Sequence, residues 1–199
     1  MSPNGKVYDM SDNHQREKLA DECTIFYHNR LVDAIKKFDN ELLVSEGFFT
    51  INAVSERPDG LYPNGMRWDH RYPPTFPVLA RTELDFIDMH SYRGDRLTSI
   101  SQHIENDLKS MNFYDKATQE MLKEKPIIMG EFGSWKNVDL SVGSAAESVD
   151  KMRNYVLKKG FEGYLYWTFD TFSQSERLYN MMSGDREILK KISNVDLNK

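Results

Sequence analysis

The pattern of hydrophobic and polar positions predicts helices and strands that alternate along the chain. From about residue 16 to residue 38, apolar side chains recur at three- and four-residue steps, which is the spacing of an amphipathic helix. Similar spacing predicts helices over about 99–123, 144–159 and 184–195, and a short helical turn over 77–81. Continuous apolar runs predict buried strands at 41–49, 84–90, 125–131 and 163–168.

This order of elements predicts the fold class. Four buried strands separated by helical segments are typical of a parallel α/β arrangement. Ser144-Ala-Ala-Glu147 reads as a capping box that opens one helix, and Gly160 reads as the C-cap that closes it. No internal repeat, low-complexity tract or linker divides the sequence, so we expect a single domain over residues 1–199.

Residues 50–74 are predicted to form a long irregular loop that contains six prolines or glycines and several aromatic side chains. Loops of this length inside a compact domain are usually functional or disordered. Tyr62 and Trp68 are candidates to line a sugar-binding subsite, because aromatic faces stack on sugar rings. The alternative is that both side chains anchor the loop.

Composition excludes several classes of function. The net charge of −5 gives no electrostatic reason to expect a nucleic-acid partner. No apolar stretch approaches the roughly 20 residues of a membrane span. Cys23 is the only cysteine, so the chain cannot form an intrachain disulfide or a cysteine metal cluster. The sequence gives no reason to expect a cofactor or a metal.

Polar and aromatic side chains follow three of the predicted strands. One strand ends in His90-Ser-Tyr92, the next in Gly130-Glu131-Phe-Gly133, and the last in Trp167. Ligands of parallel α/β proteins bind at the carboxyl ends of the strands, so we expect these side chains to share one rim. A carboxylate there can attack an oxocarbenium-like centre, while histidine and tyrosine orient it and an indole supports a sugar ring.

At these residues the sequence resembles the cellulase-like glycosidases of glycoside hydrolase clan A, closest to family five. The resemblance rests on His90-Ser-Tyr92, on Pro-Ile-Ile-Met-Gly-Glu131-Phe-Gly and on Trp167. It implies a (β/α)₈ barrel of the TIM type, of which this chain carries the C-terminal half with strands five to eight. It further implies that Glu131 is the catalytic nucleophile, that His90 and Tyr92 assist it, and that Trp167 contacts the substrate. Secretion or another extracytoplasmic location is also implied.

One departure from the clan pattern concerns the acid/base glutamate, which the clan carries after strand four, usually behind an asparagine. No Asn-Glu pattern precedes Arg16, so we expect this chain to lack the acid/base half of the site. Glu46 is the only strand-end carboxylate that could replace this acid, but it lies one strand too late, which favours a structural role. The expected partners are a carbohydrate substrate and either a missing N-terminal half or a second copy bound through open barrel edges.

The resulting functional hypothesis is a retaining glycoside hydrolase that acts on a β-linked oligo- or polysaccharide. A different class of function also fits the residues: a non-catalytic carbohydrate-binding or interaction protein built on an incomplete barrel. A third alternative is a half-barrel enzyme that completes its site across a dimer.

Overall fold

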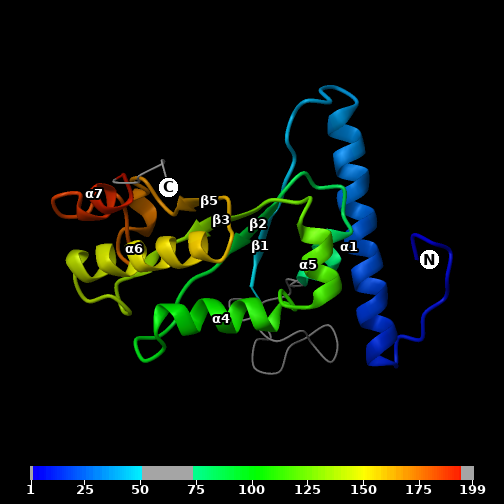
Figure 1. Ribbon diagram of the computed structural model, residues 1–199, viewed down its shortest axis with the longest axis horizontal. Helices are drawn as coiled ribbons and strands as arrows, with labels where there is room; N and C mark the ends of the chain where they lie inside the picture. The colour runs from blue at the N-terminus through cyan, green and yellow to red at the C-terminus, as the bar shows by residue number, and fades with distance from the viewer. Residues whose placement is uncertain (1, 51–73, 194–199) are drawn as a thin grey trace. The chain divides into compact units, whose positions relative to one another are not determined.

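The structure is a computed structural model that describes residues 2–50 and 74–193 (Figure 1). The helices are α1 (Asn13–Lys36), α3 (Phe76–Ala80), α4 (Ile100–Ser110), α5 (Lys116–Leu122), α6 (Val142–Lys158) and α7 (Glu187–Ser193), with a 3₁₀ turn η1 (Phe172–Gln174). The strands are β1 (Gly47–Phe49), β2 (Ile87–His90), β3 (Ile127–Phe132), β4 (Ser134–Trp135), β5 (Gly163–Tyr166) and β6 (Leu178–Tyr179).

The sheet follows the order of the chain. Its four strands are arranged β1-β2-β3-β5, and β3 pairs with β5 in parallel. Because helices connect consecutive strands of this sheet, the predicted α/β class with a parallel sheet is confirmed. The sequence pattern did not predict β4 and β6, which form a separate antiparallel pair.

The chain divides into two compact units, Met1–Asp88 with Asp107–Pro126, and Met89–Asn106 with Ile127–Lys199. In the first unit, α1 begins at the N-cap Asp12, whose carboxylate accepts hydrogen bonds from two backbone amides of the first turn. The helix α3 contacts both α1 and α5, and its side chains Phe76, Val78 and Leu79 are buried.

The strand predicted at 41–49 is shorter in the structure, so the prediction is wrong for its first part. Only Gly47–Phe49 pairs as a strand, and both Leu42 and Leu43 are exposed. The reason is Asp85, whose carboxylate accepts hydrogen bonds from Val44 N at 2.7 Å and Lys36 Nζ at 2.8 Å. A side-chain carboxylate therefore takes the backbone amide that a regular strand pair would use.

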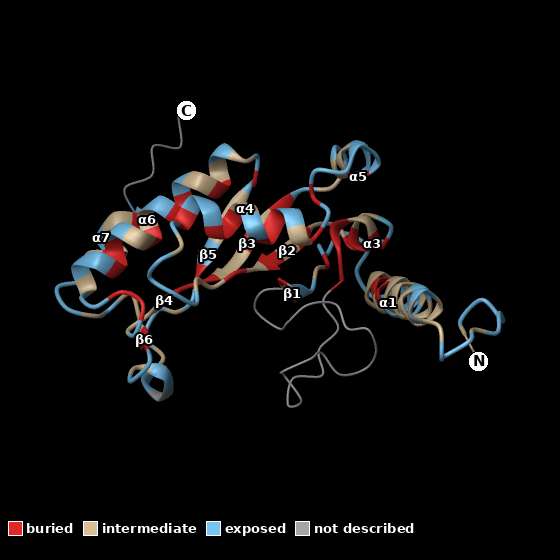
Figure 2. Ribbon diagram, turned by 90° about the horizontal axis from the view of Figure 1, so that it is seen from below, coloured by how far each residue is buried: buried red, intermediate tan, exposed pale blue. Residues whose placement is uncertain are grey.

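The second unit is built around β3, on which Ile127, Met129 and Phe132 are buried. Buried residues recur on one side of α6, whose other side is exposed (Figure 2). Helices α6 and α7 pack together (Figure 1), and the Arg153 guanidinium donates to the carbonyl oxygen of Lys191 at 2.9 Å. This contact satisfies a carbonyl that the end of α7 leaves without an intrahelical partner.

The two ends of α6 were predicted with unequal success. The capping box lies one turn earlier than expected, because Ser141 is the N-cap and exchanges hydrogen bonds with Ser144. At the other end, Gly160 adopts a φ of +89°, and Phe161 N donates to Val156 O at 3.1 Å. This left-handed residue confirms the predicted glycine C-cap.

Candidate active site

Glu131 lies near the carboxyl end of β3, beside an irregularity in the strand pairing. Met129 faces Tyr164 and Phe132 faces Tyr166, so three steps along β3 correspond to two along β5. An extra residue of this kind bends the strand and redirects the side chains next to it, and it is common beside active sites. The Glu131 side chain is 19% exposed, so solvent reaches a carboxylate that is otherwise enclosed.

Each oxygen of the Glu131 carboxylate has its own neighbour. The Tyr92 hydroxyl donates to Oε1 at 2.7 Å, and His90 Nδ1 lies 3.5 Å from Oε2. Ser91 N donates to the backbone oxygen of Glu131 at 3.0 Å, so the segment after β2 lies directly beside the end of β3. The structure therefore brings together three of the residues singled out from the sequence.

Tyr92 is fixed as a hydrogen-bond donor. Burial raises the pKa of the Tyr92 phenol far above its usual value, and the hydrogen bond to the Glu131 carboxylate raises it further. The phenol therefore keeps its proton at every physiological pH. Glu131 Oε1 therefore always faces a hydrogen-bond donor, which fixes the orientation of the carboxylate.

Gly133 allows the neighbouring segments to approach this closely. A Cβ atom at this position would lie 2.7 Å from the carbonyl oxygen of Trp167 and 3.0 Å from Cε1 of Tyr92. Both distances are shorter than ordinary carbon contacts. A side chain at this position would therefore push the Tyr92 ring or the end of β5 away from β3.

Trp167 follows β5 at the same end of the sheet as Glu131. Its backbone amide donates to Phe132 O at 2.8 Å, and the peptide bond that links it to Thr168 is cis. The indole is partly exposed, and its Nε1 donates to Oε1 of Gln174. The backbone of Trp167 thus lies at the rim expected from the sequence, with its ring oriented by the 3₁₀ turn.

A buried carboxylate holds the segments that flank Tyr92. Asp139 Oδ1 accepts hydrogen bonds from Arg93 Nη2 at 2.8 Å and Ser148 Oγ at 2.7 Å, and its Oδ2 accepts one from Ser134 Oγ at 2.7 Å. Only 7% of the Asp139 side chain is exposed. Because Arg93 follows Tyr92 directly, this network fixes the backbone that carries the phenol.

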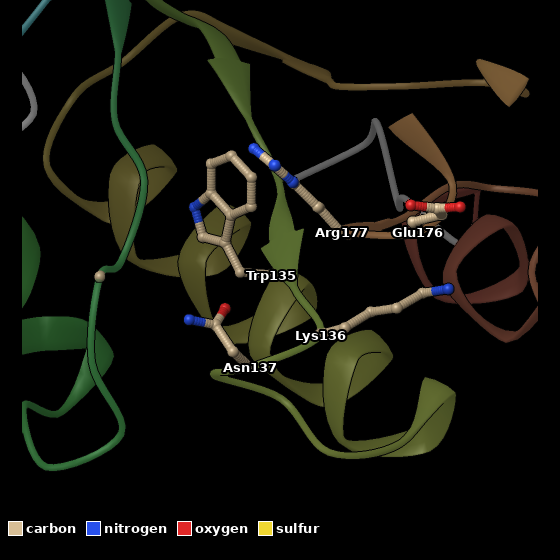
Figure 3. Close-up of a pocket in the computed structure, with 6 residues that line it drawn as sticks. Trp135, Lys136, Asn137, Glu176 and Arg177 are labelled. Carbon is tan, nitrogen blue, oxygen red and sulfur yellow. The ribbon is translucent and has the colours of Figure 1, made fainter. Parts of the chain in front are cut away.

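A pocket of about 680 Å³ opens beside Tyr92. The pocket is lined by Gly94, Trp135, Lys136, Asn137, Glu176 and Arg177 (Figure 3). The ring of Trp135 contacts the ring of Tyr92, with 5.5 Å between their centroids. The sequence analysis did not single out any of these residues. The one signal was Trp135 itself, an aromatic side chain two residues after the glycine that ends the Glu131 motif.

The remaining candidates from the sequence lie elsewhere. Tyr62 and Trp68 fall outside the described residues. Glu46 belongs to the first unit, where its Oε2 lies 2.6 Å from Nε2 of the buried His28. The carboxylate of Glu46 is therefore already in contact with a histidine.

Two properties of the described residues concern metals and membranes. Within residues 2–50 and 74–193, no group of three histidine, cysteine or acidic side chains is arranged to hold a metal ion. No helix in that part of the chain is long and apolar enough to cross a membrane.

Comparison with known proteins identifies similar folds but does not assign the chain to a family. No protein-family model matches the chain, and no curated protein sequence matches it. Among solved structures, the endo-1,4-beta-mannanase from Rhizomucor miehei is similar with a TM-score of 0.54 and 15% identity, over 87% of this chain and 47% of that one. The hyperthermostable endo-1,4-beta-D-mannanase from Thermotoga petrophila RKU-1 gives a TM-score of 0.53 and 16% identity, over 94% of this chain and 54% of that one.

At such identities the likeness is one of fold. The chain spans about half the length of these mannanases. Its α/β fold with a parallel sheet therefore matches part of the (β/α)₈ barrel of these enzymes.

Proposed function

We propose that Glu131 is the nucleophile of a retaining glycoside hydrolase site that acts on a β-linked oligo- or polysaccharide. The observation that carries the proposal is the Glu131 carboxylate at a strand end, held by the Tyr92 hydroxyl at 2.7 Å and flanked by His90 at 3.5 Å. In this proposal β1, β2, β3 and β5 correspond to strands five to eight of one barrel domain, as the resemblance to clan A implies.

The proposed reaction begins with attack by a Glu131 oxygen on the anomeric carbon of the substrate. A bond forms between that oxygen and the anomeric carbon while the bond to the leaving-group oxygen breaks, which gives a glycosyl-enzyme ester. Water then cleaves the ester, releases the sugar with retained configuration and restores the carboxylate. The Tyr92 hydroxyl orients the attacking carboxylate, and His90 lies at its other oxygen.

A second carboxyl group must protonate the leaving group of a natural substrate. Retaining enzymes place the two carboxyl groups roughly 5 Å apart. Glu46 contacts His28 in the first unit, so we assign it a structural role and propose that the acid/base group comes from another part of the barrel. We therefore expect this chain alone to leave natural oligosaccharides intact, because positioned proton transfer contributes about 10² to 10⁴ in rate.

Covalent labelling tests whether Glu131 acts as the nucleophile even when the acid/base group is missing. A 2-deoxy-2-fluoroglycoside with a dinitrophenolate leaving group needs no proton from the enzyme, so it reports on Glu131 directly. The manno- and gluco-configured reagents are tried in parallel, because the similar structures include mannanases. Mass spectrometry of the digested protein is expected to find one added sugar on the peptide that contains Glu131.

The isosteric Glu131→Gln variant is the control, because it keeps the size of the side chain and removes the charge. It should take up no label. Labelling at another carboxylate would contradict the proposed nucleophile. Cleavage of oligosaccharides by the wild-type chain that is lost on Glu46→Gln would identify Glu46 as the acid.

The second candidate function is carbohydrate binding without catalysis. It is favoured by Trp135, which is partly exposed in an open pocket and whose ring contacts the ring of Tyr92. Oligosaccharide binding that persists in Glu131→Gln, together with no labelling of the wild-type chain by either reagent, would favour this second function.

A further inference from the structure

The pocket that contains Trp135 and Arg177 is not used by the chemistry proposed for Glu131. Both residues line a hollow of about 680 Å³, within the range of small-molecule sites. The two sides of the hollow come from distant parts of the sequence. Trp135 lies on β4 and Arg177 directly precedes β6, and these two strands pair antiparallel. Lys136 N donates to Arg177 O at 2.8 Å, so the backbone fixes both walls.

The chemistry of the lining points to a sugar. An indole offers an apolar face, while the guanidinium of Arg177 and the amide of Asn137 offer donors, and the carboxylate of Glu176 offers acceptors. Sugar hydroxyls both donate and accept, and one face of a hexose ring is apolar, so a neutral sugar uses all of these groups. Glu176 offsets one of the two positive charges of the lining, which come from Lys136 and Arg177.

Arg177 is the donor best placed for this role. Figure 3 shows its side chain pointing towards the Trp135 indole, whereas the side chain of Lys136 points away from it. Lys136 Nζ is engaged with Ser175 O and lies 5.3 Å from the centroid of the Tyr179 ring. Among the described residues, the Arg177 side chain makes no hydrogen bond or ion pair, and its guanidinium carries five donors.

Tyr92 connects the pocket to the candidate nucleophile. Its hydroxyl contacts Glu131 at 2.7 Å, and its ring contacts Trp135 with 5.5 Å between centroids. From this arrangement we infer that the pocket is a subsite for a second, neutral sugar unit of the chain whose reacting unit lies at Glu131. The inference rests on the proposed function of Glu131, and it adds that the substrate is recognised through at least two linked sugars.

The test is direct binding, measured by isothermal titration calorimetry with β-1,4-linked manno- and cello-oligosaccharides of one to four units. The wild-type chain should bind the longer oligosaccharides more tightly than the monosaccharide. Arg177→Ala should weaken binding of the tetrasaccharide roughly tenfold, the loss expected for one hydrogen bond to a charged group, and leave the monosaccharide unchanged. Trp135→Ala should have the same selectivity, and Arg30→Ala on the exposed surface of α1 is the charge-matched control.

The outcomes separate this inference from the proposed function. If Glu131 is labelled by the single-sugar reagent but Arg177→Ala binds the tetrasaccharide as tightly as the wild-type chain does, the subsite is wrong and the nucleophile stands. Tighter binding of oligosaccharides that carry a uronic acid would overturn the assignment of a neutral sugar. Loss of length dependence in Trp135→Phe, which keeps an aromatic face, would contradict stacking as the basis of recognition. Circular dichroism of each variant verifies that it is folded.

Discussion

The Tyr92 hydroxyl donates a hydrogen bond to Glu131 Oε1 over 2.7 Å, and the ring of the same tyrosine packs against Trp135. One side chain therefore contacts both the candidate nucleophile and the candidate sugar pocket. Its two contacts can be separated by mutation, because the hydroxyl makes one and the ring makes the other.

Tyr92→Phe removes only the hydroxyl. We expect the rate of covalent labelling at Glu131 to fall roughly ten- to a hundredfold, because a hydrogen bond to a charged group contributes about 1.5–3 kcal/mol. Tyr166→Phe is the matched control, since Tyr166 is also buried but its hydroxyl donates to Tyr179 O. The labelling rate is followed by mass spectrometry. Equal rates in the wild type and Tyr92→Phe would remove Tyr92 from the site.

Gly133→Ala should damage the site through packing. Its new Cβ would meet the Trp167 carbonyl oxygen at 2.7 Å, so the neighbouring backbone must shift. Overpacking of this kind costs about 1–3 kcal/mol, which thermal unfolding would measure as a lower Tm. Gly143→Ala, in the first turn of α6, is the control. The nearest atom to its new Cβ would be Ser141 Oγ at 3.9 Å, which is an ordinary contact distance. An unchanged Tm for Gly133→Ala would show that β3 and the end of β5 tolerate a wider spacing.

Asp85 is expected to make the free energy of unfolding of the first unit depend on pH. Burial acts to raise the pKa of Asp85, but hydrogen bonds from Lys36 and Val44 outweigh it and hold the pKa below its usual value. A carboxyl with a lowered pKa in the folded state stabilises above its unfolded pKa of about 3.9 and loses that contribution as the pH falls through its folded pKa. Asp85→Asn should therefore cost about 1 kcal/mol at pH 7.

The same difference should shrink as the pH falls below about 4, because the wild-type carboxyl is then neutral too. Urea unfolding of both proteins at pH 7, 5 and 3 measures it. A constant difference across this range would mean that the shape of the side chain matters and its charge does not.

Because β5 is an edge strand of the sheet, we expect the chain to self-associate through it. Strand β5 ends the strand order β1-β2-β3-β5, and its Leu165 side chain is 60% exposed. An apolar edge strand tends to pair with another chain. Size-exclusion chromatography should find a larger species as the concentration rises, and Leu165→Lys should shift it towards the monomer. A wild-type chain that stays monomeric at high concentration would contradict this expectation.

The sequence predicted the parts of the site that depend on regular structure. His90, Tyr92 and Glu131 could be grouped because each follows a continuous apolar run, and parallel strands place their carboxyl ends at one edge. The strand at 41–49 was predicted too long, since periodicity carries no information that the Asp85 carboxylate would take the amide of Val44. Trp135 and Arg177 were missed because β4 and β6 have two residues each, too few for any period to appear.

The three hydrogen bonds to Asp139 have a consequence for how the second unit opens. They join the segment after β2, strand β4 and helix α6, which are distant in sequence and share one buried acceptor. Once that carboxylate is exposed, all three segments lose a partner together, so their slowest amides should exchange with deuterium at one common free energy. The candidate nucleophile and the candidate sugar pocket would then unfold together, and partial unfolding would not leave one without the other.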